Sequence, residues 1–249
     1  MRSFKYYSND LLLATLKQAK SEDVKPIFEH LDLTYSASVP IKTVVIRISQ
    51  TGGNSFTNLF KDGDTVGYLR IVVSVAKALG ISAEGLDRYL NADNQENSNP
   101  ALVAGLKHEI SGVIYDIEGK IIEVIAGKLY QKLNAEQRKA FDTEVRRVAS
   151  QRSDDPSRSI IGAGGALLIG NLGGFGTYML MSSLLSTLSL GTLGFGAYTF
   201  ASSALSVVLG PAGWAALGAY AIFKLNNPSL TKLVPIVIAV ALIRRKYSR

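Results

Sequence analysis

The last 94 residues of this chain contain no acidic residue, and 65 consecutive residues within them, 159–223, carry no charged side chain of either sign. Residues 1–155 carry 20 basic and 20 acidic groups, so the net charge of +7 lies entirely in the C-terminal part. A soluble surface normally mixes both signs of charge, and an uncharged stretch of this length usually meets lipid. The sequence therefore predicts two parts of the chain with different surroundings.

The change in charge also predicts the domain boundaries. We expect residues 1–150 to form a soluble helical domain that senses a signal or serves as a scaffold. Residues 151–158 form a polar linker, and residues 159–249 form a membrane-active helical domain. The N-terminus has no apolar stretch of signal-peptide length, and the chain has no cysteine. Both features fit a cytoplasmic N-terminal domain.

Apolar residues at helical spacing predict an all-α fold. Helix starts are expected at Ser8 or Asn9, Ser21, Asp64, after Ser82, and at Asn99–Pro100. Residues 41–49 fit a strand by their β-branched content, but an isolated strand has no partner here, so a helix is favoured. Gly80 is expected to end the helix that starts at Asp64. Residues 91–100 are polar and predict a loop.

The helix from Pro100 is expected to reach Leu133. Gly105, Gly112 and Gly119 lie at heptad spacing along it, and such a row lets another backbone approach closely. The alternative is that these glycines are scattered in a breakable helix. Asn134 and Gln137 form a capping-box pattern before a further charged helix that ends near Ala149.

Within the C-terminal part, residues 159–181 and 183–209 each exceed the roughly 20 residues that span a bilayer core. Small residues spaced by four predict a helix-packing ridge in the first of them: Gly162, Ala166, Gly170 and Gly174. Residues 212–223 and 233–243 are too short to span and predict a re-entrant or interfacial hairpin. The alternative is a buried helical hairpin within a soluble or oligomeric assembly.

Aromatic and basic residues around the short apolar runs are typical of a membrane interface with anionic headgroups. The residues predicted to lie there are Trp214, Tyr220, Lys224, Lys232, Arg244, Arg245 and Lys246. These basic residues bracket apolar runs and do not line a polar face, which argues against nucleic acid as a partner. We expect the protein to bind a lipid bilayer and to associate with further copies of itself. We also expect the N-terminal domain to bind a protein partner.

Residue spacing predicts no catalytic, metal or cofactor site. His30 and His108 lie far apart, and neither has a second histidine three or four positions away. Asp62 and Asp64 resemble the start of a calcium loop, but Val73 stands where that loop needs a carboxylate. The glycine-rich runs after Gly162 and at Gly194 lack a preceding strand and a P-loop lysine.

Several segments together resemble the YaaW-like family of uncharacterised bacterial proteins, which is associated with the ubiquinol–cytochrome c chaperone group. The matching stretches are YYSNDLLLATLKQAKSED, GGNSFTNLF, VGYLRIVVSVAKALGI, KLYQKLNAEQRKAF, GPAGWAALG and VPIVIAVALIRR. They cover most of the chain. The resemblance implies a helical fold and brings no catalytic residues. The longer and more apolar stretch at 159–209 departs from the family and strengthens the membrane interpretation.

Together these features predict a non-enzymatic protein that inserts in the bacterial inner membrane with its N-terminal domain in the cytoplasm. Insertion is either constitutive or conditional from a soluble cytoplasmic form. The protein would oligomerise and form a pore or perturb the membrane, an analogy with pore-forming effectors. The alternative function is a membrane-associated assembly chaperone for membrane proteins.

Overall fold

The computed structural model describes residues 4–54, 65–94, 100–150, 209–216 and 227–247, together with the pairs 177–178, 181–182 and 184–185. Every regular element in these residues is a helix, which confirms the predicted all-α class for this part of the chain. The predicted ridge Gly162, Ala166, Gly170 and Gly174 lies outside the described residues, and so do Tyr220 and Lys224.

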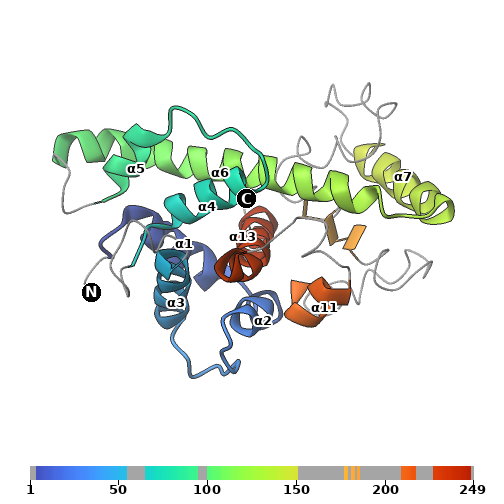
Figure 1. Ribbon diagram of the computed structural model, residues 1–249, viewed down its shortest axis with the longest axis horizontal. Coiled ribbons are helices and arrows are strands. Elements are labelled where there is room, and N and C mark those ends of the chain that lie inside the picture. The colour runs from blue at the N-terminus through green and yellow to red at the C-terminus, as the bar shows by residue number, and fades with distance from the viewer. Residues whose placement is uncertain are drawn as a thin grey trace.

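One helix lies at the centre of the structure, and five of the other described helices pack around it (Figure 1). The helices are α1 (Tyr7–Gln18), α2 (Ser21–His30), α3 (Ile41–Asn54), α4 (Tyr68–Ala78), α5 (Asp87–Asp93), α6 (Pro100–Tyr130), α7 (Ala135–Ser150), α11 (Pro211–Ala216) and α13 (Pro228–Tyr247). The central helix is α13, which contacts α1, α2, α3, α4 and α6. The long helix α6 runs along one side of this bundle, and α7 follows at its far end.

Several predicted elements are present as expected. Residues 41–49 are helical within α3, so the preference for a helix over a strand is confirmed. The chain leaves α4 through Gly80, whose φ of 80° is a conformation that glycine adopts without strain. The capping box is confirmed, since the Asn134 amide donates to Gln137 Oε1 at 3.0 Å and the Gln137 amide donates to Asn134 Oδ1 at 2.9 Å.

Two boundaries differ from the prediction. Helix α4 begins at Tyr68, so Val66 precedes the helix instead of lying on its apolar face. Helix α5 continues to Asp93, although residues 91–100 were predicted to form a loop. Asp93 is only 2% exposed and makes hydrogen bonds to α1, and these tertiary contacts outweigh the loop preference of the local sequence.

The largest correction concerns the C-terminus. Residues 233–243 were predicted to form a short interfacial segment, but they are the middle of the 20-residue helix α13. Twelve of its residues are buried, and they include the whole run from Leu233 to Ile243. A helix that is apolar on every side must be covered all round, and five other helices supply that cover. The C-terminal helix therefore belongs to the same helical body as α1–α6, and not to a separate domain.

Several described residues of the uncharged stretch are also buried. Tyr178, Met181, Leu184 and Leu185 are at most 6% exposed. Helix α11 packs against α2, and Trp214 on α11 is 2% exposed, inside the protein and not at an exposed interface. Among the helices that the structure describes, none is both long and apolar enough to cross a membrane.

Candidate functional site

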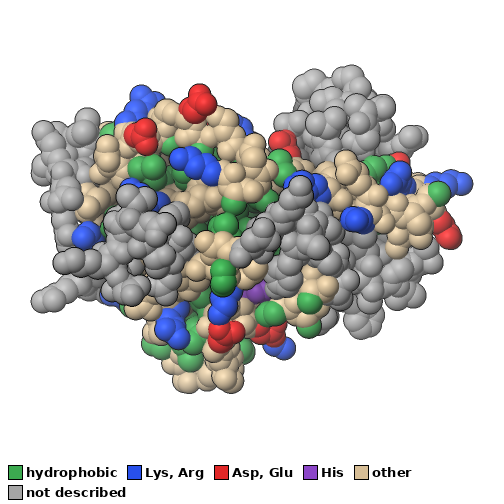
Figure 2. Space-filling model, viewed as in Figure 1, with side chains coloured by type: hydrophobic (Ala, Val, Ile, Leu, Met, Phe, Trp, Pro, Cys, Tyr) green, Lys and Arg blue, Asp and Glu red, His purple; other side chains and the backbone are tan. Residues whose placement is uncertain are grey.

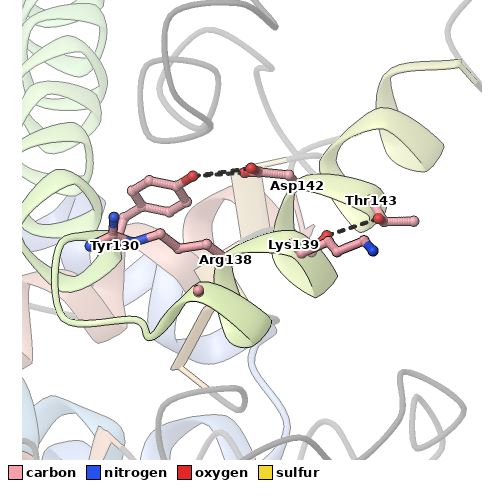
Figure 3. A pocket seen from close by; sticks show the side chains of 6 residues that line it. Tyr130, Arg138, Lys139, Asp142 and Thr143 are labelled. Atoms are coloured by element: carbon pink, nitrogen blue, oxygen red, sulfur yellow. Dashed lines mark hydrogen bonds between the residues drawn. The ribbon is translucent and has the colours of Figure 1, made fainter.

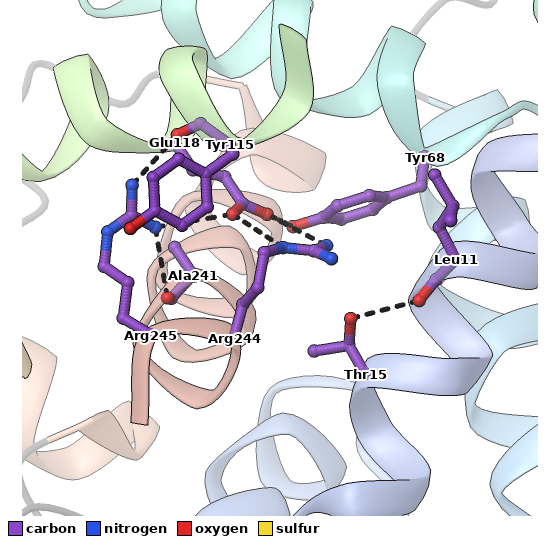
Figure 4. A network of polar contacts seen from close by, with 8 residues as sticks. All are labelled: Leu11, Thr15, Tyr68, Tyr115, Glu118, Ala241, Arg244 and Arg245. Atoms are coloured by element: carbon purple, nitrogen blue, oxygen red, sulfur yellow. Dashed lines mark hydrogen bonds and ion pairs between the residues drawn. The ribbon is translucent and has the colours of Figure 1, made fainter. Parts of the chain in front are cut away.

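The basic residues of α13 meet carboxylates that come from the N-terminal half of the chain. Glu118 on α6 is fully buried and accepts hydrogen bonds from two consecutive arginines of α13 (Figure 4). Arg244 donates from Nε to Glu118 Oε2 at 3.0 Å and from Nη2 to Oε1 at 3.4 Å. Arg245 donates from Nη1 to Oε2 at 3.5 Å. Glu118 therefore joins the centre of α6 to the end of α13.

Tyr68, at the start of α4, completes this contact from a third helix. Its hydroxyl donates to Glu118 Oε1 at 2.9 Å, and the side chain is fully buried. Burial and the charge of Glu118 raise the pKa of Tyr68 well above its ordinary value, so the hydroxyl keeps its proton and remains a donor. Although burial lowers the pKa of Arg244, Glu118 and Tyr68 together raise it above its ordinary value. We name Tyr68, Glu118, Arg244 and Arg245 the central network.

Arg245 is held from several sides and is only 2% exposed. Its Nη2 donates to the Tyr115 carbonyl at 2.9 Å, and its Nη1 donates to the Ala241 carbonyl at 3.2 Å. The guanidinium lies over the Tyr115 ring, 4.3 Å from the centroid, as a cation–π pair. The two contacts with Tyr115 fix the last turns of α13 against α6, whereas the contact with Ala241 lies within α13.

A second set of contacts fixes α13 to α2. Lys246 Nζ lies 2.7 and 2.9 Å from the two carboxylate oxygens of Asp23, and the Tyr247 hydroxyl donates to Asp23 Oδ2 at 2.7 Å. At the other end of α13, Lys232 forms an ion pair with Asp32, which directly follows α2. Asp32 has a φ of 56°, in the left-handed region.

These contacts give carboxylate partners to four residues that were predicted to lie at a membrane interface, Lys232, Arg244, Arg245 and Lys246. Each of the four pairs with a carboxylate of the same chain, at Asp32, Glu118 or Asp23. The C-terminal part does carry an excess of positive charge. Carboxylates on α6, on α2 and just after α2 pair with four of its basic residues. The sequence reveals the imbalance of charge, whereas the carboxylate partners lie between 126 and 223 positions away and only the fold brings them close.

The predicted glycine row of α6 divides into two parts. A Cβ added at Gly105 or Gly112 would meet no described atom within 4 Å, and both positions are exposed. At Gly119 an added Cβ would lie 3.2 Å from Arg245 Nη2. The close approach therefore occurs at Gly119, where α6 meets α13.

A buried polar cluster that sequence reasoning missed joins α1, α4 and α5. Asp93 accepts hydrogen bonds from the Ser8 amide and hydroxyl, each at 2.6 Å, and Ser8 Oγ accepts from the Leu69 amide at 3.0 Å. Asn9 Oδ1 accepts from the Tyr68 amide at 2.9 Å, and its Nδ2 donates to the Val66 carbonyl at 3.2 Å. Ser8 and Asn9 were expected as caps of their own helix, but they satisfy the first amides of α4 instead. Burial raises the pKa of Asp93 to about 6.

His30 connects α2 to Leu209, which lies within the uncharged stretch. Its Nε2 lies 2.7 Å from the Leu209 carbonyl, and the residue is 3% exposed. Burial lowers the pKa of His30, so the neutral ring is favoured, with Nε2–H as the donor to the carbonyl. Leu209 is the last residue of the second predicted span. His30 therefore fixes Leu209, close before α11, to α2.

Two cavities lie along α6. One, of about 540 Å³, lies where α6 meets α7 and is lined by Tyr130, Ala135, Arg138, Lys139, Asp142 and Thr143 (Figure 3). The Tyr130 hydroxyl donates to Asp142 there, and burial together with that carboxylate raises the pKa of Tyr130. The other cavity, of about 360 Å³, lies between α1, α6 and α13 beside Arg244.

Basic side chains lie at several separate places on the described part of the face in Figure 2, with acidic side chains near several of them. This distribution differs from the continuous basic stripe that a phosphate backbone requires. No family model, curated protein or solved structure matches this chain, and the resemblance to the YaaW-like family stays a prediction.

Proposed function

We propose that this protein is a non-enzymatic membrane protein of the bacterial inner membrane, in which a helical bundle presents the uncharged segment 159–208 to the bilayer. The bundle comprises α1–α6 together with α13 and remains on the cytoplasmic side. The uncharged segment leaves the bundle after α7 and returns to it at Leu209. This proposal keeps the two predicted spans, residues 159–181 and 183–209, as a membrane hairpin but removes α13 from the membrane-active part.

The observation that carries the proposal is the fixing of the return point. Leu209 is bound to His30 on α2, and α13 is bound by ion pairs to Glu118, Asp23 and Asp32. A segment held in this way must leave and re-enter on the same side of a bilayer, which requires an even number of spans. Two spans of the predicted lengths satisfy that condition. Arg158 directly precedes the segment in sequence and would meet anionic headgroups.

Conditional insertion is favoured over constitutive insertion. Tyr178, Met181, Leu184 and Leu185 belong to the proposed hairpin, and all four are buried against protein. Lys246 Nζ lies 5.1 Å from the centroid of the Tyr178 ring, so this part of the hairpin lies beside the end of α13. The hairpin would therefore exchange protein contacts for lipid contacts when it inserts.

Vesicle flotation of the full chain tests the proposal. The protein is mixed with dye-loaded vesicles of phosphatidylcholine alone or with about one third phosphatidylglycerol, and floated and free protein are separated on a density gradient. We expect flotation and dye release with the anionic vesicles. Phe195→Lys should suppress both, because a charge in mid-span costs about 2.5–3.5 kcal/mol on insertion scales. Ala135→Lys, at an exposed position on α7, is the matched control and should behave like the wild type.

Two outcomes would overturn this proposal. Protein that stays unbound to vesicles of every anionic content lacks the membrane function. Protein that leaves vesicles intact but co-purifies with one membrane protein is better described as an assembly chaperone.

Self-association within the bilayer is the second part of the proposal. The ridge Gly162, Ala166, Gly170 and Gly174 would let two hairpins approach closely, since apolar side chains gain nothing from one another in lipid. Gly170→Leu keeps the span apolar but fills the ridge. We expect this variant to float with vesicles but to lose chemical crosslinking between copies and dye release. Unchanged crosslinking would remove the ridge from the proposal.

A further inference from the structure

The cavity between α1, α6 and α13 lies directly beside the central network. Its volume of about 360 Å³ falls within the roughly 300–1,000 Å³ of small-molecule sites. Leu11, Ala14 and Ile243 contribute apolar side chains to its lining. Polar groups come from the other lining residues, Thr15, Gln18, Ser111, Tyr115, Arg244 and Tyr247. The cavity thus combines an apolar surface with a cationic one.

The charge beside this cavity is positive. In the central network, two guanidinium groups share the single carboxylate of Glu118, and Tyr68 stays neutral, so these four residues together carry a net charge of +1. Arg244 is 14% exposed and lines the cavity, and Arg245 lies over the ring of Tyr115 on the cavity wall. A positive charge at a poorly solvated site favours the approach of an anion.

We propose that this cavity binds a single-chain fatty acid, with the carboxylate beside Arg244 and the hydrocarbon chain along Leu11, Ala14 and Ile243. A planar guanidinium matches a carboxylate in shape and charge, and the apolar lining accommodates the chain. The bound acid would contact α1, α6 and α13 at once and so stabilise the position of α13. This binding does not depend on the membrane function proposed above, because the site lies within the bundle.

Calorimetric titration of the full-length protein tests the site with three probes: decanoate below its micelle concentration, decanol and acetate. We expect saturable binding of one decanoate per chain. A hydrogen bond to a charged group contributes about 1.5–3 kcal/mol, so decanol should bind at least about tenfold more weakly. Acetate, which has the carboxylate but no chain, should also bind at least about tenfold more weakly. Equal affinity for decanoate and decanol would overturn the assignment to Arg244.

A pair of variants locates the binding. Ala14→Trp places a large ring in the cavity from an exposed position on α1 and should weaken decanoate binding at least about tenfold. Ala135→Trp makes the same change at an exposed position that lines the cavity between α6 and α7, and it should leave binding unchanged. Circular dichroism checks that both variants keep their helical content. Undiminished binding by Ala14→Trp would place the fatty acid elsewhere, including on the uncharged segment, and would overturn the proposal.

Discussion

Glu118 on α6 and Arg244 on α13 face each other at the centre of the bundle, with 3.0 Å between Glu118 Oε2 and Arg244 Nε, although 126 positions separate them in the chain. Glu118 is fully buried and Arg244 is largely buried, so neither charge is well solvated. This pair attaches α13, near the C-terminus, to the middle of α6.

Removing the carboxylate of Glu118 should destabilise the fold strongly. Glu118→Ala leaves Arg244 and Arg245 buried without their counter-charge, and breaking a buried pair in this way costs about 3–5 kcal/mol. Urea unfolding followed by circular dichroism measures the loss. Glu29→Ala is the control, because its pair with Lys25 is exposed, spans 3.9 Å and should contribute about 0–1 kcal/mol. Similar losses in the two variants would contradict the importance of the central network.

Asp93 should make the fold more stable in acid. Because burial raises its pKa from 3.8 to about 6, the folded state holds the proton more tightly than the unfolded state does. The contribution of Asp93 to the free energy of unfolding is therefore complete below pH 3.8. It is lost as the pH rises to about 6, a change of roughly 3 kcal/mol. Asp93→Asn should remove that part of the pH dependence in urea titrations between pH 4 and 7. The same change at the exposed Asp87 should leave it in place.

His30 should act in the opposite direction. Its pKa lies below 6.5 in the folded state because burial disfavours the charged ring, so the unfolded state binds the proton more readily. Stability should fall as the pH drops below 6.5. His30→Gln can keep a donor to the Leu209 carbonyl without titrating, and it should reduce this acid-dependent loss. His108→Gln, on the exposed side of α6, should leave the loss unchanged.

The glycines of α6 should respond differently to alanine. Gly112→Ala meets no described atom within 4 Å, and the better helix propensity should stabilise the fold by up to about 1 kcal/mol. Gly119→Ala places a methyl group 3.2 Å from Arg245 Nη2, which is held by the Tyr115 carbonyl. Displacing that hydrogen bond costs about 1–3 kcal/mol, so this variant should be less stable than the wild type. Thermal unfolding of both variants compares their stabilities. An equal gain in stability would show that Arg245 on α13 moves aside for the added methyl group.

Local sequence predicted the features of the fold that depend on neighbouring residues. The capping box of Asn134 with Gln137 and the stop at Gly80 are each decided within a few positions. The loop expected at residues 91–100 was wrong at its start, because Asp93 is held by Ser8, 85 positions earlier. A distant partner outweighed the local preference there.

The sequence by itself determined that this chain is helical, that its acids all precede residue 156, and that a long uncharged segment precedes a basic C-terminus. Only the tertiary structure decided where that C-terminus lies. An apolar helix with basic ends is equally compatible with a bilayer and with the interior of a bundle, since both exclude water from its sides. The carboxylates of Asp23 and Glu118 decide between the two, because they pair with Lys246 and Arg244 only after α2 and α6 have packed around α13.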